Sequence, residues 1–424
     1  MSELRVLSIY EGFFSGGARI LHSDVVLGLH GGVQRHSVLS IEGEMHREAT
    51  RQPMEEDACY RALTAGGVPV AALRRGPDAG PGWGGTGGTS AFGALLTPAS
   101  APALSATSAP AFSAAELAAT ARATAAADVV LSLKEQPLAL LNQAGLPLRP
   151  VVVCLHRSDP ENQGPALDAL LAAVAAGRVK ACVCCAESTR GAYAAAGVPA
   201  ELLHVIPNGV DLLRFRPDPV RRAGLRAELG IPAPAPVVAF AARWAGMKNV
   251  PLFLAAAREF LRRDPDGRVL MCGAGMTAGN QGLRAEIAAA LAGEPWLADR
   301  MLLLGVRGDM EAVYAASDVV SLTSSSGEAA PLCLIEGMMC GAVPVATDVG
   351  DCARLVAGRG LLTPPDPEAI ATAWAEAFTR ASSFAPALEA AREEFSRTRM
   401  VAAYGALIDQ VHRGAPRAAL PEPL

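Results

Sequence analysis

Short apolar runs alternate with helical stretches along this 424-residue chain, and the alternation occurs twice. The first series of predicted strands covers residues 5–10, 35–41, 68–73, 128–133, 150–156, 180–186 and 204–206. The second series covers residues 237–242, 268–273, 300–305, 318–323 and 343–347. Strands that are apolar along their whole length are buried on both faces of a parallel sheet. The pattern therefore predicts an α/β protein with two doubly wound domains.

Predicted helices separate most of these strands. They cover residues 18–30, 113–126, 164–176, 250–263, 281–291, 310–316 and 332–340, with a last helix over 395–412. Pro207, Asn208 and Gly209 and the prolines that follow mark a linker between the two series. The sequence therefore predicts an N-terminal domain over residues 1–208, a C-terminal domain over 209–394, and a C-terminal helix and tail over 395–424. A ligand is expected beyond the carboxyl ends of the strands, in a cleft between the domains.

Charge and composition exclude several classes of protein. The chain has 37 Lys and Arg against 42 Asp and Glu, a net charge of −5, so a nucleic-acid partner is not expected. No run of 18 apolar residues predicts a membrane span, and the N-terminus lacks the layout of a signal peptide. These features favour a cytoplasmic protein and leave peripheral contact with a membrane surface open. Nine cysteines, several of them in apolar strands, are interpreted as reduced core residues.

One segment breaks the alternation. Residues 76–112 are rich in Gly, Pro, Ala, Ser and Thr and nearly uncharged. The glycines of residues 84–88 resemble a phosphate-binding loop, but no strand or helix adjoins them. A mobile loop is therefore the preferred interpretation, with a lid over a substrate as the alternative.

The most informative motif covers residues 324–341, after the predicted strand 318–323. Pro331 suits the first position of a helix, and Gly341 suits its end. The backbone N–H groups of Leu332 and Cys333 then form an anion site at the helix N-terminus. Glu336 lies about 7.5 Å further along the axis, a distance that suits a diphosphate at the tip and a ribose beside it. The alternative is that Glu336 pairs with a core arginine or extends to solvent.

Three further elements lie at the ends of predicted strands. Arg243 and Lys248 flank a glycine turn after strand 237–242 and could clamp a diphosphate, or could belong to a solvated turn. His156 ends strand 150–156, where a lone histidine is either structural or catalytic. Gly16 and Gly17 open the first long helix, where a ligand could approach closely.

Taken in order, these motifs resemble the retaining, nucleotide-sugar-dependent glycosyltransferases with the GT-B fold, the group 1 or family 4 type. The hallmark is a glutamate followed by seven residues and a second glutamate, here Glu328 and Glu336. The stretch 336–350 follows the family pattern after the second glutamate. The stretch 205–211 resembles its interdomain signature. Arg243 and Lys248 fall where the family has its diphosphate-binding pair, and the resemblance covers nearly the whole chain.

The resemblance implies a role for each site residue. Arg243 and Lys248 would stabilise the leaving diphosphate, and Glu328 would contact the hydroxyls of the donor sugar. The ribose would bind Glu336, with the diphosphate at Pro331, Leu332 and Cys333. In the N-terminal, acceptor-binding domain, His156 would hydrogen-bond the donor sugar, and Gly16 and Gly17 would lie over the phosphates.

Mechanism and substrates also follow from the resemblance. It implies transfer with retention of anomeric configuration, from a UDP-sugar in preference to a GDP- or ADP-sugar, to a small-molecule, glycan or lipid-linked acceptor. No cofactor and no metal are expected, because two cations already face the diphosphate. Asp264 and Asp266 have the spacing of metal ligands but are interpreted as a turn away from the cleft. Ala329 and Ala330 replace the more usual Gly-Phe, which leaves the identity of the sugar open, and Arg157 stands where an aspartate is common.

Three other functions fit parts of the sequence. A nucleotide-sugar epimerase could use the same fold, and a non-catalytic sugar-binding protein could use the same site. An NAD(P)-dependent oxidoreductase would use the glycines at 273, 275 and 279 as a nucleotide fingerprint. The third glycine of that fingerprint is misplaced, and no acidic residue ends the following strand.

Overall fold

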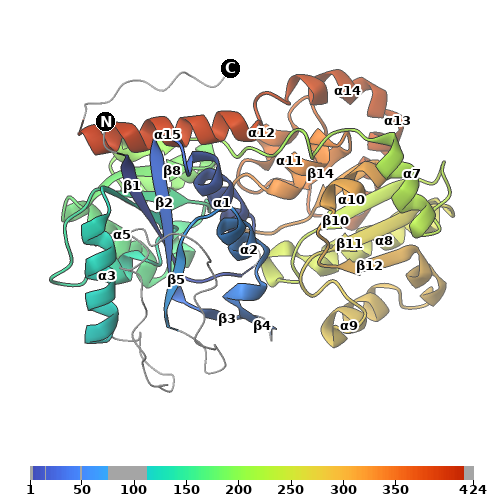
Figure 1. Cartoon of the computed structure of the whole chain (residues 1–424). Helices are drawn as coiled ribbons and strands as arrows, with labels where there is room; N and C mark the ends of the chain where they lie inside the picture. Colours follow the sequence, from blue (N-terminus) through green and yellow to red (C-terminus); the bar gives the residue numbers. More distant parts are fainter. Residues whose placement is uncertain (1–2, 15, 48–49, 75–111, 415–424) are drawn as a thin grey trace. The chain divides into compact units, whose positions relative to one another are not determined.

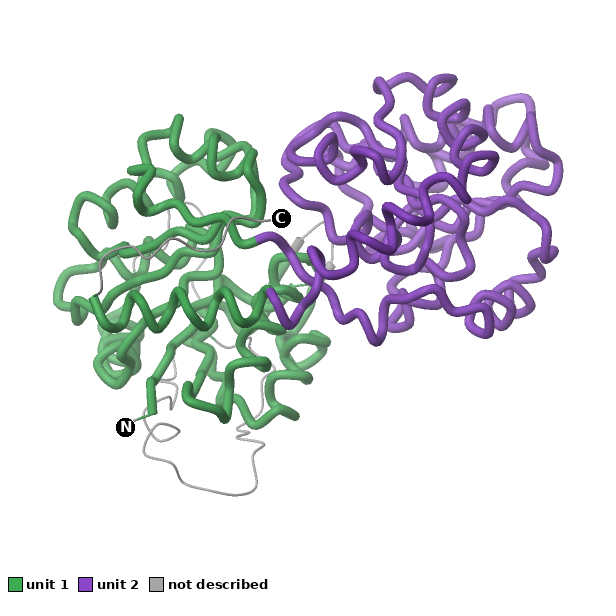
Figure 2. The backbone as a smooth tube through the Cα atoms, turned by 90° about the horizontal axis from the view of Figure 1, so that it is seen from above, with its two compact units in different colours: residues 1–206, 400–424 green, residues 207–399 purple. Residues whose placement is uncertain are grey.

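The computed structural model describes residues 3–14, 16–47, 50–74 and 112–414. The chain forms two compact units (Figure 2). Unit 1 comprises Met1–Ile206 and Met400–Leu424, and unit 2 comprises Pro207–Arg399. The predicted loop over residues 76–112, except Phe112, lies outside the described residues.

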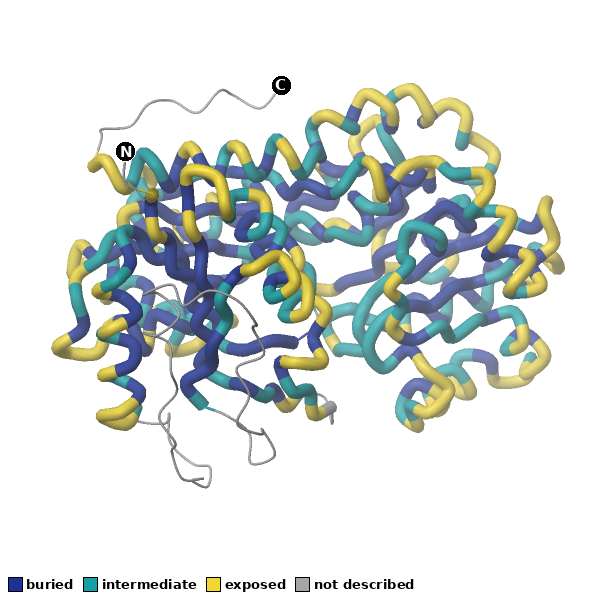
Figure 3. Tube along the Cα trace, in the orientation of Figure 1, coloured by how far each residue is buried: buried dark blue, intermediate teal, exposed yellow. Residues whose placement is uncertain are grey.

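The sheet of unit 1 has seven strands within the described residues, and every neighbouring pair is parallel (Figure 1). In spatial order they are β5 (Val70–Arg74), β2 (Gln34–Glu42), β1 (Leu4–Tyr10), β6 (Val129–Leu133), β7 (Val151–Leu155), β8 (Val179–Cys184) and β9 (Leu203–Val205). The central strands are buried along nearly their whole length, as Figure 3 shows, because helices cover the sheet.

Unit 1 contains the α-helices α1 (Gly17–Leu29), α2 (Ala58–Ala65), α3 (Ala114–Ala126), α4 (Leu138–Leu141), α5 (Pro165–Ala175) and α6 (Glu187–Ala195). The 3-10 helices of unit 1 that the described residues contain are η1 (Met54–Glu56), η3 (Pro160–Gln163) and η4 (Ala200–Leu202). Helix α3 starts at a capping box, in which the Ser113 side chain accepts from the Glu116 N–H and the Glu116 carboxylate accepts from the Ser113 N–H.

The last helix, α15 (Arg397–Arg413), belongs to unit 1 from Met400 onward. It lies against α1, where a β-carbon on Gly28 would come within 2.8 Å of Val401. Gln34 of β2 donates to the Asp409 carboxylate of α15 at 3.0 Å. The predicted return of the C-terminal helix to the N-terminal domain is therefore confirmed.

Unit 2 has a six-stranded parallel sheet, counted over the residues that the structure describes. Its order is β12 (Met301–Gly305), β11 (Arg268–Cys272), β10 (Val237–Ala241), β13 (Val319–Leu322), β14 (Val343–Thr347) and β15 (Leu361–Thr363). Its helices are α7 (Pro219–Glu228), α8 (Val250–Arg263), α9 (Gln281–Ala290), α10 (Met310–Ala316), α11 (Leu332–Met339), α12 (Cys352–Val356), α13 (Pro367–Thr379) and α14 (Ala381–Ala390), with the 3-10 helices η5 (Gly246–Lys248) and η6 (Pro295–Arg300).

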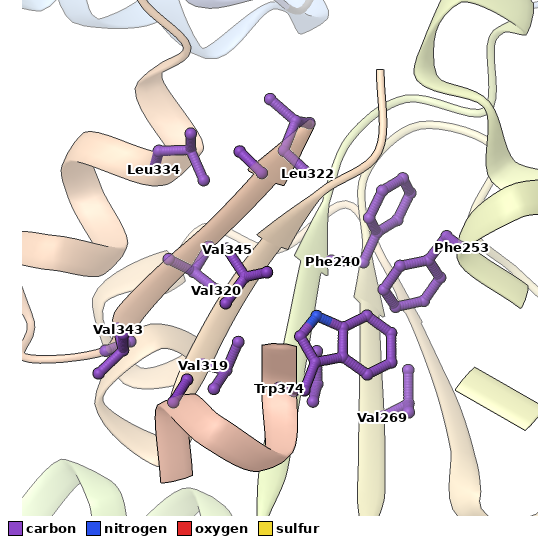
Figure 4. Packing of buried hydrophobic residues seen from close by; sticks show 14 of the residues in the cluster. Phe240, Phe253, Val269, Val319, Val320, Leu322, Leu334, Val343, Val345 and Trp374 are labelled. Carbon is purple, nitrogen blue, oxygen red and sulfur yellow. The ribbon is translucent and has the colours of Figure 1, made fainter. Parts of the chain in front are cut away.

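Aromatic side chains fill one face of this second sheet (Figure 4). Phe240 of β10 stacks on Phe253 of α8 with ring centroids 4.2 Å apart, and Trp374 of α13 packs against Phe253 at 5.5 Å. The Trp374 indole N–H donates to the Ser321 hydroxyl at 3.0 Å, so its polar atom is satisfied in the core.

The fold confirms the predicted α/β class with two doubly wound sheets, and each predicted strand is present within two residues of its predicted bounds. The sequence reading missed the antiparallel pair β3 (Glu44–Arg47) and β4 (Thr50–Pro53), and the edge strand β15. The strands β3 and β4 carry polar residues, and β15 has only three residues, so none of them gives the signal of a buried strand. None of the nine cysteines, all of which lie in the described ranges, forms a disulfide, and seven of them are buried. No helix among the described residues is long and apolar enough to cross a membrane.

Candidate functional site

The order of strands in unit 2 changes direction between β10 and β13. The chain runs from β10 outward through β11 and β12, and then from β13 outward through β14 and β15 on the other side. In open α/β sheets, ligands bind beyond the carboxyl ends of the strands at such a switch point. The loops after β10 and β13 contain Arg243, Lys248 and Glu328, so three predicted site residues lie there.

The loop after β10 is fixed by its backbone. The N–H of Trp244 donates to the carbonyl of Ala274, in the loop after β11, at 2.8 Å. Lys248 ends η5, and Asn249 then turns the chain into α8 with a positive φ of 50°. Arg243 and Lys248 thus lie on a partly exposed turn whose backbone is held by its own hydrogen bonds.

Lys248 and Glu328 meet although 80 residues separate them in the sequence. The ammonium group of Lys248 contacts the Oε1 atom of the buried Glu328, and the Ser324 hydroxyl donates to the same oxygen at 2.6 Å. The Thr323 hydroxyl donates to the Lys248 carbonyl at 3.2 Å. These bonds join the two loops into one polar cluster of opposite charges.

The backbone of the loop after β13 is anchored from three sides. The Asn208 side chain donates to the Ala330 carbonyl at 2.7 Å. The Thr347 hydroxyl donates to the Ser324 carbonyl at 2.7 Å. The backbone N–H of Asp351 donates to Ala329 at 2.8 Å. A loop held in this way can present charges without reorganising when a ligand binds.

Gly350 lets the backbone before α12 pack closely against the loop after β13. Gly350→Ala is therefore expected to destabilise unit 2 by about 2–4 kcal/mol. Its φ is +63°, and a β-carbon there would lie 2.3 Å from the carbonyl oxygen of Glu328. Urea denaturation would measure the change. The control is Gly358→Ala, where φ is +71° but no atom lies within 4 Å, so only the left-handed backbone is penalised. Equal losses in both variants would contradict the close packing at Gly350.

Helix α11 begins at Leu332, so the predicted first helical position of Pro331 is wrong by one residue. Pro331 has an extended ψ of 122° and precedes the helix, while its carbonyl accepts from the N–H of Leu334 at 3.2 Å. Leu332 and Cys333 are the first two helical residues, whose N–H groups have no partner within the helix. Burial raises the pKa of the Cys333 thiol to about 12, which keeps it neutral. Gly341 follows the helix with a φ of +91°, as its predicted place at the end requires.

Glu336 lies on α11 and is half-buried. The hydroxyl of Tyr314, on α10, hydrogen-bonds its carboxylate; burial and then the charge of Glu336 raise the pKa of Tyr314 well above its ordinary value. Tyr314 is therefore one core neighbour of Glu336, and the arginine partner that the sequence offered as an alternative stays open. The ribose contact of Glu336 stays a prediction.

Three predicted site residues belong to unit 1. His156 follows β7, and burial together with the nearby Lys134 lowers its pKa to about 3, so the ring is neutral. Its Nε2 atom has no hydrogen-bond partner among the described residues. Gly16 precedes α1, and a β-carbon there would meet nothing closer than the Phe14 carbonyl at 4.0 Å. Packing within unit 1 therefore does not require a glycine at position 16. The roles of His156, Gly16 and Gly17 toward a donor stay predictions.

Sequence reasoning missed two partners in unit 2. Tyr314 lies outside every motif, and Ser324 lies inside the motif 324–341 but was not singled out. No cluster of three or more metal-ligating side chains occurs in the described part of the chain. Asp264 follows α8, and its side chain accepts from the N–H of Asp266 at 3.1 Å, as in the predicted turn.

Two family models match the chain. Residues 235–380 match "Glycosyl transferases group 1", and residues 61–214 match "Glycosyltransferase Family 4". A D-inositol 3-phosphate glycosyltransferase of Nocardia farcinica is 35% identical over 175 residues, which are 40% of this chain and 38% of that protein. Its counterpart in Saccharomonospora viridis is 35% identical over 218 residues, 49% of each chain. The matched stretch thus spans less than half the length of these two relatives.

Solved structures extend the likeness over the whole fold. The crystal structure of Anabaena Alr3699/HepE in complex with UDP-glucose has a TM-score of 0.74 and 21% identity, and covers 96% of this chain and 100% of that one. Sucrose-phosphate synthase from Thermosynechococcus elongatus has a TM-score of 0.67 and 18% identity, and covers 97% and 100%. These neighbours confirm the predicted GT-B fold.

Proposed function

We propose that this chain, which matches the group 1 glycosyltransferase model over residues 235–380, moves a sugar from a UDP-sugar to a hydroxyl group of an acceptor with retention of anomeric configuration. One observation carries the proposal. At the switch point of unit 2, Lys248 from the loop after β10 joins Ser324 and Glu328, from the loop that leads into α11, in one fixed polar cluster. A diphosphate bound there would meet the positive end of that helix and the Lys248 ammonium.

The nucleotide is proposed from a structural neighbour. Alr3699/HepE was crystallised with UDP, with UDP-glucose, and with UDP and glucose. Its fold is that of this chain, and the Lys248 cluster offers the cation that a diphosphate needs. We therefore propose UDP as the nucleotide.

Bond cleavage makes the sugar oxocarbenium-like and adds negative charge to the diphosphate. Preorganised cations facing that charge are the main source of rate acceleration in such a step. Arg243 and Lys248 would supply them, and the donor phosphate would take the proton of the acceptor during front-face attack. With two cations in place, we propose that no divalent metal is needed, so activity should persist in EDTA.

The decisive experiment is incubation of the protein with UDP-glucose and a panel of hydroxyl acceptors. A transferase releases UDP in step with a new glycoside, and NMR of that glycoside reports whether the α configuration is kept. Sugar isomerisation without a glycoside would indicate an epimerase. Binding of UDP-glucose without any turnover would indicate a sugar-binding protein.

A further inference from the structure

The sheet of unit 1 has its own switch point, between β1 and β6. The chain runs from β1 outward through β2 and β5, and from β6 outward through β7, β8 and β9. The loops after β6 and β7 adjoin, because these strands pair in parallel. The Gln136 side chain in the first loop donates to the Gln163 side chain in the second at 3.3 Å.

The turn after β6 places Glu135. Lys134 has a φ of +68° and, with Asn249, is one of two non-glycine residues with positive φ in the described ranges. Its N–H donates to the Cys154 carbonyl at 3.0 Å, and its carbonyl accepts from the Ser132 hydroxyl at 2.8 Å. Hydrogen bonds to its N–H and its carbonyl therefore hold Lys134 in a left-handed conformation that non-glycine residues disfavour.

Three buried polar atoms in these two loops have no hydrogen-bond partner among the described residues. They are Oε1 of Glu135, Oε1 of Gln136 and Nε2 of His156. Glu135 is only 2% exposed. Native proteins rarely bury polar atoms without partners, because the lost hydration is not replaced. A bound ligand would supply the missing partners.

The charges around Glu135, Gln136 and His156 indicate which kind of ligand would fit. The Arg157 guanidinium is bound by both carboxylate oxygens of Asp159, at 2.7 and 2.5 Å, so its charge is compensated locally. Lys134 adds a cation, and burial raises the pKa of the Glu135 carboxyl above its ordinary value. Two of the three orphaned atoms, the oxygens of Glu135 and Gln136, only accept hydrogen bonds. A ligand with hydroxyl donors fits this set, whereas a phosphate would place its oxygens against the Glu135 carboxyl.

We propose that Glu135 selects the acceptor, by accepting hydrogen bonds from hydroxyl groups of a polyol or sugar that carries no phosphate at the end bound in this cluster. This inference rests on the proposed function and narrows its acceptor class. It separates this chain from the relatives named for D-inositol 3-phosphate.

The test compares matched acceptor pairs: myo-inositol with D-inositol 3-phosphate, and glucose with glucose 6-phosphate. Binding is measured by calorimetry with UDP present, and transfer is measured with UDP-glucose. We expect the unphosphorylated member of a pair to bind more tightly and to react faster. Because Glu135→Gln replaces one carboxyl oxygen by an amide NH2 group that donates, a hydroxyl donor of the acceptor loses its partner, and the KM of that member should rise by roughly 10- to 100-fold. The KM for UDP-glucose and its slow hydrolysis without acceptor should stay unchanged.

Glu161→Gln is the matched control, since Glu161 is an exposed glutamate in η3 of the neighbouring loop. Thermal unfolding of both variants separates misfolding from loss of recognition. Three results would overturn this inference. The phosphorylated member of a pair could bind more tightly, neither unphosphorylated compound could bind at all, or folded Glu135→Gln could keep an unchanged KM for the acceptor. Failure of the wild-type protein to turn over UDP-glucose would instead overturn the proposed function.

Discussion

Lys248→Ala is expected to lower turnover of the UDP-sugar by about 10²- to 10³-fold, a loss of roughly 3–4 kcal/mol of transition-state stabilisation. The ammonium is held beside Glu328 at the N-terminal end of α11, where the leaving diphosphate would gain charge. Because this interaction strengthens as the bond breaks, kcat should fall more than the affinity for UDP. Steady-state kinetics with coupled detection of UDP would measure both.

The same substitution removes the counter-charge of a buried carboxylate. The side chains of Lys248 and Glu328 are only 17% and 8% exposed, so Lys248→Ala should also cost about 3 kcal/mol of stability. Adding Glu328→Gln removes the unpaired charge. We therefore expect the double variant to regain most of the stability without regaining activity, which separates catalysis from folding.

Lys180→Ala is the matched control, since Lys180 is exposed on β8. Arg243→Ala should lose activity to a degree similar to that of Lys248→Ala. Normal turnover in Lys248→Ala and Arg243→Ala would refute their assignment to the diphosphate.

Acidification is expected to destabilise unit 1 strongly. Burial lowers the pKa of His22, His36 and His156 to about 3, from an ordinary value of 6.5. The unfolded chain binds protons at these histidines below pH 6.5, whereas the folded chain does not bind them until about pH 3. The contribution of these histidines to folding stability is therefore complete above pH 6.5, and it decreases as the pH falls from 6.5 towards 3. Between pH 8 and pH 5 the loss is about 2 kcal/mol for each histidine, or about 6 kcal/mol in all.

Urea denaturation at pH 8 and pH 5 would measure this loss. His36→Gln should reduce the difference by about a third, although it also alters the 3.0 Å contact between His36 and the Gln34 side chain. His412→Gln should leave the difference unchanged, because His412 is exposed on α15. Equal stability at the two pH values would show that the three rings are hydrated or paired in solution.

The sequence predicted the strands well because their signal is local. A run such as residues 237–241 is buried on both faces, so it is apolar throughout and can be read without knowing its neighbours. Helix ends followed from local chemistry in the same way, as with Gly341 after α11. Pro331 was misplaced by one residue because a proline suits both the position before a helix and its first turn.

The site residues were proposed from spacing and resemblance, which name residues but not their contacts. From the sequence, Lys248 and Glu328 were candidates in two separate motifs, and Tyr314 was not among the candidate site residues. Their meeting depends on which strands are neighbours, since β10 and β13 pair although about 80 residues lie between their loops. Glu135 was missed for the same reason, because a carboxylate without a partner can be recognised only when its surroundings are known.

By itself, then, the sequence determined the α/β class, the two series of strands and the residue types available at the proposed site, because hydrophobic periodicity and helix termini are encoded over a few residues. Only the tertiary structure decided which charges are paired, which polar atoms are left unsatisfied and which glycine is required, because those properties arise where distant segments pack against one another.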